Sequence, residues 1–131
     1  MKIENAIKEG FLKLKQNNIE TALLDSQILM SKTIKRDQKF IILNSGKNLK
    51  SCDYQLFKKL ISYRAKGKPV AYLTGIKSFW NYDFSLNEKV LIPRPDSELI
   101  VDQVLKIYKN KRKINFLEVG VGSGCLILSI L

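Results

Sequence analysis

A short apolar run that leads directly into three alternating glycines limits most strongly how this chain can fold. Residues 114–119 read Ile-Asn-Phe-Leu-Glu-Val, and Gly120, Gly122 and Gly124 follow at every second position. An apolar run of this length predicts a buried strand, and glycine permits a tight turn because it adopts positive φ. Residues 125–131 are again apolar and compatible with a helix. The pattern predicts a strand, a glycine turn and a helix, the first β-α unit of a Rossmann-like α/β domain.

The glycine spacing narrows the class of ligand that this turn can hold. A dinucleotide fingerprint, G-x-G-x-x-G, would require glycine where Cys125 stands. The spacing instead favours S-adenosylmethionine, which carries an amino-acid group and an adenosine but no pyrophosphate, and which needs close contact with the backbone. The candidate cofactor-binding residues are Glu118, Gly120, Val121, Gly122, Ser123 and Gly124. The alternative is a tight turn after a strand that binds no ligand.

Four helical patterns occupy the first half of the chain. Apolar residues at three- and four-residue spacing predict helices that end near Gln16, Thr33, Asn44 and Gly67. Asp37 is expected to cap the third helix, and Ser51 or Asp53 the fourth. Because the apolar stripes of these helices have no partners except each other, we expect residues 1–75 to form a small helical bundle.

The character of the sequence changes after Gly75. Residues 76–92 predict a β-hairpin linker that turns at Asn81-Tyr82, and residues 93–131 predict the beginning of the cofactor domain. The two prolines around Arg94 impose extended geometry. Pro95 then begins a helix, whose expected buried face consists of Leu99, Ile100, Val101, Val104, Leu105 and Tyr108.

Composition excludes several classes of site and leaves the partner open. The net charge is +11, with 15 basic and 6 acidic residues before Gly75 and 8 basic and 6 acidic residues after it. Such an excess can attract nucleic acid, an anionic membrane or an acidic protein, but a solvated lysine surface is the simpler interpretation. The chain has no histidine and only two distant cysteines, so we expect no metal site. No signal peptide or membrane-spanning run is visible, so we expect a cytoplasmic protein. We also expect a monomer.

Three further segments carry a resemblance to a known family. Residues 67–75 read Gly-Lys-Pro-Val-Ala-Tyr-Leu-Thr-Gly, Phe79-Trp80 follows, and residues 90–98 read Val-Leu-Ile-Pro-Arg-Pro-Asp-Ser-Glu. In order and spacing these segments, together with the glycine turn, resemble the release-factor glutamine N5-methyltransferases of the HemK/PrmC type. The resemblance is close over residues 67–131, and the helical first half is compatible with the small N-terminal domain of that family.

The resemblance implies transfer of a methyl group from S-adenosylmethionine to the glutamine of the Gly-Gly-Gln motif in class 1 peptide chain release factors. The N-terminal helices would help to dock the release factor. The pocket-lining residues carried over by position are Ile92, Pro93, Arg94 and Pro95. An ordinary capping role or surface ion pair is the alternative for Arg94.

The family holds its substrate glutamine in an Asn-Pro-Pro-Tyr loop, and these 131 residues contain no such loop. We therefore expect no catalytic residue within this chain, and a truncated, inactive N-terminal portion of the enzyme. Two rival hypotheses stay open. One is a fragment of a nucleic-acid methyltransferase, for which salt-sensitive RNA binding would be evidence. The other is a non-catalytic helical binding module.

Overall fold

The computed structural model describes residues 1–111 and 113–131, which form two compact units. The first unit spans Met1–Thr74 and the second spans Gly75–Leu131. Within the described residues, we find no helix that combines the length and the apolar character needed to cross a membrane.

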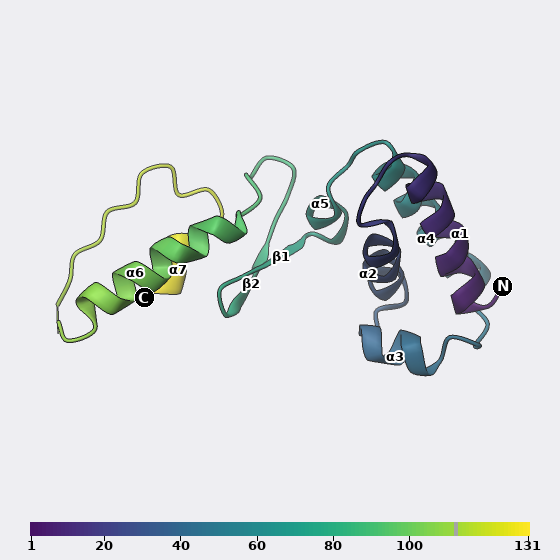
Figure 1. Ribbon diagram of the computed structural model, residues 1–131, viewed down its shortest axis with the longest axis horizontal. Helices are drawn as coiled ribbons and strands as arrows, with labels where there is room; N and C mark the ends of the chain where they lie inside the picture. The colour runs from purple at the N-terminus through teal and green to yellow at the C-terminus, as the bar shows by residue number, and fades with distance from the viewer. Residues whose placement is uncertain (112) are drawn as a thin grey trace. The chain divides into compact units, whose positions relative to one another are not determined.

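The first unit is entirely helical, apart from an isolated bridge between Lys2 and Asn48. The helices α1, α2 and α4 pack against one another, with α3 near one end of the group (Figure 1). The four predicted helices are confirmed, and their C-terminal ends lie at most two residues from the predicted positions. The elements are α1 (Ile3–Gln16), α2 (Ala22–Ile34), α3 (Gln38–Leu43), α4 (Ser51–Ala65) and α5 (Val70–Thr74).

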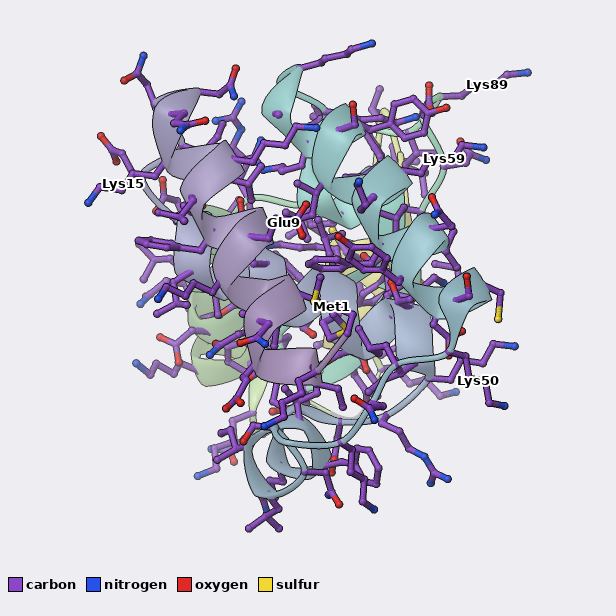
Figure 2. The ribbon with its side chains drawn as sticks, turned by 90° about the vertical axis from the view of Figure 1, so that its right-hand side faces the viewer. Met1, Glu9, Lys15, Lys50, Lys59 and Lys89 are labelled. Atoms are coloured by element: carbon purple, nitrogen blue, oxygen red, sulfur yellow. The ribbon has the colours of Figure 1, made fainter. Side chains whose placement is uncertain are left out.

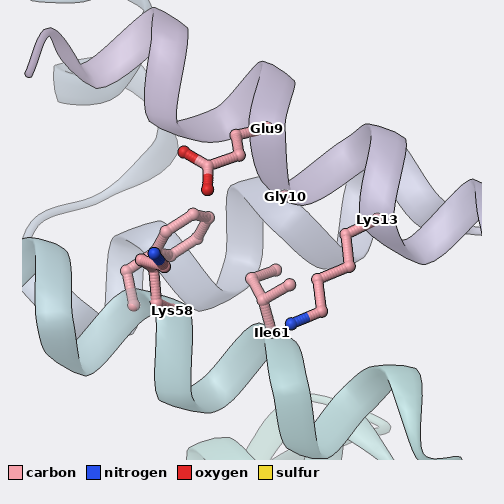
Figure 3. A pocket seen from close by; sticks show the side chains of 6 residues that line it. Glu9, Gly10, Lys13, Lys58 and Ile61 are labelled. Carbon is pink, nitrogen blue, oxygen red and sulfur yellow. The ribbon is translucent and has the colours of Figure 1, made fainter.

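The core of the first unit is built from the predicted apolar stripes. Its fully buried side chains include Leu14 of α1, Leu29 and Met30 of α2, and Phe57 of α4. Gly10 lets α1 approach α4 closely, because a Cβ added there would lie 2.8 Å from Phe57 Cζ. A cavity of about 30 Å³ adjoins this contact, and Figure 3 shows it between the two helices.

One ion pair is enclosed by the bundle and joins α2 to α4. Arg64 Nε donates to Asp25 Oδ2 at 2.7 Å, and the two side chains are 18% and 7% exposed. Both side chains have lost most of their contact with water, so each charge is stabilised mainly by the other.

Local signals at the helix ends were correct in one case and wrong in another. Asp37 caps α3 as predicted, because its Oδ1 accepts a hydrogen bond from Phe40 N at 2.9 Å. The predicted cap of α4 is wrong. Ser51 is already the first residue of α4, and Lys50 holds the N-cap position without a side-chain hydrogen bond.

In its described residues, 75–111 and 113–131, the second unit combines a hairpin with two α-helices and one short 3₁₀ turn. Its elements are β1 (Ile76–Phe79), β2 (Tyr82–Ser85), η1 (Pro95–Ser97), α6 (Glu98–Tyr108) and α7 (Cys125–Ile130). The strands are antiparallel, and Phe79 pairs with Tyr82. The hairpin is therefore confirmed, but the turn lies one residue earlier than predicted, at Trp80-Asn81. Trp80 takes a left-handed conformation there, with φ of 55°.

The strand predicted at residues 114–119 is not formed in the part of the chain that the structure describes. Leu117 and Val119 are 91% and 90% exposed, whereas a buried strand would have covered both, because residues two apart lie on the same face of a strand. A strand requires hydrogen bonds from a neighbouring strand, and β1 and β2 pair with each other instead. Of the predicted β-α unit, the described residues contain the glycine turn and the helix α7.

The apolar face predicted for α6 is also largely exposed. Val101 is fully buried against Phe79 and Phe84, but Leu99 and Ile100 are 63% and 51% exposed. The amphipathic pattern correctly predicted the helix and correctly placed Val101 in the core. It overestimated how much of the helix is covered within the second unit.

Candidate functional site

The glycine turn has a conformation that depends on its glycines. Gly120, Gly122 and Gly124 have φ values of 76°, 58° and 75°. Residues with a Cβ rarely adopt this left-handed region. A hydrogen bond of 2.8 Å from Gly124 N to Val121 O closes the turn. Gly120, Val121 and Gly122 are exposed, whereas Ser123 is half-buried and Gly124 is buried at the start of α7. The turn therefore presents its first three residues as accessible backbone.

The side chain of Glu118 contacts the helix that follows the turn. Its Oε2 accepts a hydrogen bond from Ile127 N, in the first turn of α7, at 3.2 Å. A carboxylate in this position is favoured by the free N–H groups and the positive end of the helix dipole. The structure thus brings Glu118 and the glycine turn together at the beginning of α7. The Glu118 side chain is half-buried, and its other carboxylate oxygen, Oε1, takes no part in this hydrogen bond.

A cavity of about 160 Å³ lies next to Glu118. Apart from Glu118 its wall is apolar, and it is formed by Ile100 of α6, by Phe116 and Leu117, and by Leu126, Ile127 and Ile130 of α7. A mostly apolar cavity with one carboxylate is a suitable environment for an organic ligand that carries a positive charge.

The predicted pocket segment at residues 92–95 lies elsewhere in the second unit. Pro93 is buried and Ile92 is half-buried, whereas Arg94 and Pro95 are exposed. Arg94 has extended geometry, with φ of −93° and ψ of 138°, and Pro95 begins η1, as the two prolines predicted. Arg94 makes no ion pair with any residue in the described ranges. No hydrogen bond joins residues 92–95 to residues 118–124 in those same ranges.

Sequence reasoning missed the bond that anchors α6 to the hairpin. Trp80 N donates to Glu98 Oε1 at 2.8 Å, across 18 residues of sequence. Nothing local in the sequence identifies the backbone N–H that Glu98 meets. The bond fixes the end of the 90–98 segment against the turn of the hairpin.

Comparison with known proteins identifies the first unit. The PrmC N-terminal domain family matches residues 5–75, which is more than half of the chain. The chain belongs to this family. The match covers α1 from its third residue and all of α2 to α5, and it ends at Gly75, where the second unit begins.

Curated relatives extend the similarity over the second unit as well. A release factor glutamine methyltransferase of Clostridium botulinum is 33% identical over 130 residues, which are 99% of this chain and 46% of that protein. A protein of the same name from Buchnera aphidicola subsp. Schizaphis graminum is 36% identical over 131 residues, with the same shares. A bifunctional methyltransferase of Rickettsia conorii is 29% identical over 98% of this chain and 29% of its own length.

These relatives confirm the resemblance to release factor glutamine methyltransferases that the motifs indicated. The chain spans less than half the length of each of the three.

Proposed function

We propose that this chain serves S-adenosylmethionine-dependent methylation of the glutamine in the Gly-Gly-Gln motif of class 1 peptide chain release factors. The observation that carries the proposal is the similarity to release factor glutamine methyltransferases over 99% of the chain. In this proposal the helical unit docks the release factor, and the second unit contributes the first part of the cofactor site. The free cysteines Cys52 and Cys125 suit the reducing cytoplasm, where we place the reaction.

The glycine turn fits the proposed cofactor. A Cβ at Gly120 would meet nothing within 4 Å, and one at Gly122 would meet only Gly120 O at 3.9 Å, so the protein itself leaves the space beside both glycines open. A ligand can therefore approach the backbone there closely. The half-buried Glu118 carboxylate offers the opposite charge to an ammonium or sulfonium group.

In this proposal the residues of the chain bind and orient, and they move no proton. Bound S-adenosylmethionine would supply the electrophilic methyl group. The backbone of residues 120–124 would hold the cofactor, Glu118 would orient its charged end, and residues 92–95 would line the pocket beside the substrate. The glutamine-positioning Asn-Pro-Pro-Tyr sequence is absent from these 131 residues. We therefore propose that they bind the reactants without completing methyl transfer.

Calorimetric titration tests the cofactor part of this proposal. The purified chain should bind S-adenosylmethionine saturably, and Gly122→Val should abolish binding because φ of 58° is strained for a β-branched residue. Gly46→Val is the matched control, since Gly46 has no positive φ and a Cβ there would meet nothing within 4 Å. A wild-type chain that does not bind the cofactor would refute the role of the turn.

Two further measurements test the reaction and the partner. A purified class 1 release factor should bind the chain in the same calorimeter, and absence of binding would refute the docking role. Radiolabelled methyl transfer to that release factor should be undetectable with this chain alone. Detectable transfer would show that the Asn-Pro-Pro-Tyr sequence is dispensable, contrary to the proposal.

A further inference from the structure

We infer that a groove on the helical unit, formed by α1, α2 and α3, is the surface that receives an acidic amphipathic segment of the release factor. The groove has a volume of about 380 Å³. Its lining includes Ile7, Lys8 and Phe11 of α1, Leu23 of α2, and Ile41 and Ile42 of α3. The inference rests on the proposed function, because it names the partner that the function requires.

The groove is apolar within and bordered by exposed apolar side chains. Ile7 and Ile41, which are 9% and 3% exposed, are core residues that also line it. Leu23 and Ile42 line it as well but are 52% and 68% exposed, and Leu43, next to Ile42, is 83% exposed. A group of exposed, large apolar side chains beside a concave surface is typical of a protein-binding site.

The charges along α1 indicate what kind of segment fits. Glu4, Lys8, Phe11 and Lys15 follow one another at spacings of four, three and four residues, so they form one stripe along the helix. The first three line the groove, and Lys15 Nζ lies 5.6 Å from the centre of the Phe11 ring. Glu4 is already close to Lys2, at 3.9 Å. The stripe therefore offers two ammonium groups beside the apolar floor.

The opposite side of α1 is already occupied. Glu9 projects toward α4 in Figure 2, where its Oε2 accepts a hydrogen bond of 2.6 Å from the Tyr54 hydroxyl, whereas Lys15 points away from α4. The helical unit has 15 basic and 6 acidic residues. Its net positive charge attracts an acidic partner before the two proteins touch. A segment with apolar side chains flanked by Asp or Glu matches both the floor and the stripe, in the manner of a helix bound in a groove.

Binding of a purified class 1 release factor to charge-reversal variants tests the inference. Lys8→Glu should weaken binding about tenfold or more, because it places a carboxylate against the acidic segment. Lys59→Glu on α4 is the matched control, since it changes the net charge equally at an exposed lysine outside the groove. Equal weakening by both variants would show that only net charge matters and would overturn the inference.

A second pair of variants tests the apolar part of the groove. Leu23→Ser should weaken binding about fivefold to tenfold, as removal of an interface side chain does. Leu56→Ser on α4 should leave binding unchanged, since Leu56 is similarly exposed at 45% but lies outside the groove. Circular dichroism should show that all four variants keep the helical content of the wild type.

The outcomes separate the groove from the proposed function. If the wild-type chain does not bind the release factor, the proposed partner is wrong and the inference fails with it. If the wild type binds and Lys8→Glu and Leu23→Ser bind as tightly, the partner stands and the groove is refuted.

Discussion

Replacement of Gly10 by alanine should destabilise the protein, although alanine is the better helix former. In a helix interior, glycine-to-alanine replacement by itself stabilises by about 1 kcal/mol. Here the new Cβ would lie 2.8 Å from Phe57 Cζ and 3.0 Å from Ile61 Cδ1, both on buried side chains. Overpacking of this kind costs about 1–3 kcal/mol.

The expected net change follows from these two opposing contributions. The adjoining cavity of about 30 Å³ gives the Phe57 ring limited room to move, so we take about 2 kcal/mol for the steric cost. Subtracting the gain in helix propensity leaves Gly10→Ala about 1 kcal/mol less stable than the wild type. Gly10→Val, which adds two more methyl groups at the same contact, should be less stable again.

Urea unfolding of the full chain, followed by far-ultraviolet circular dichroism, measures these differences. A double-mutant cycle with Phe57→Leu identifies the cause, because leucine lacks the Cζ atom that the new methyl group would meet. Gly10→Ala should cost less in the Phe57→Leu background than in the wild type. A Gly10→Ala variant more stable than the wild type by about 1 kcal/mol would refute the close packing of α1 on α4.

Two further predictions concern side chains that join the helices. Asp25→Ala should destabilise by about 3 kcal/mol in the same urea assay, because it leaves the enclosed Arg64 without its partner. Asp102→Ala should cost under about 0.5 kcal/mol, because the half-buried Asp102 pairs with the exposed Lys106 at the surface. The hydrogen bond to Glu9 raises the pKa of Tyr54 above its ordinary value. The contribution of this bond to stability should be complete below the unfolded-state pKa and disappear as pH rises through the folded-state pKa. Glu9→Gln should lower the pKa of Tyr54, as measured by phenolate absorbance.

The contradicting outcomes are equally definite. An Asp25→Ala variant that loses no more stability than Asp102→Ala would show that the Asp25–Arg64 pair is exchangeable with water. An absorbance titration that is identical in the wild type and in Glu9→Gln would show that Tyr54 and Glu9 do not interact in solution.

The sequence predicted features whose hydrogen bonds are local. The helices α1 to α4, the Asp37 cap and the hairpin were all indicated by spacing or by residues a few positions apart. The strand at residues 114–119 was wrong because a strand takes its hydrogen bonds from a distant neighbour, which periodicity does not reveal. Leu99 and Ile100 were expected to be buried for a related reason. An apolar stripe shows which face of a helix can be covered, but not whether anything covers it.

In the candidate sites too, local features were predictable from the sequence and features that depend on packing were not. The glycine turn and its positive φ values follow from three glycines in five residues, so the sequence alone predicts them. The contact of Glu118 with Ile127 and that of Glu98 with Trp80 depend on packing across 9 and 18 residues. The role of Gly10 was missed because an isolated glycine in a helical pattern looks like a weak position until the facing Phe57 is known. The groove was missed because three separate helices line it.

The position of Trp80 makes it an optical reporter of one unit. It is the sole tryptophan of the chain, and it lies at the hairpin turn of the second unit, with its backbone tied to Glu98. Most helical residues belong to the first unit, so the far-ultraviolet signal arises mainly there. Intrinsic fluorescence and circular dichroism therefore observe different halves of the same molecule. If their melting curves coincide, the units unfold as one cooperative body, and if they separate, each half has a stability of its own.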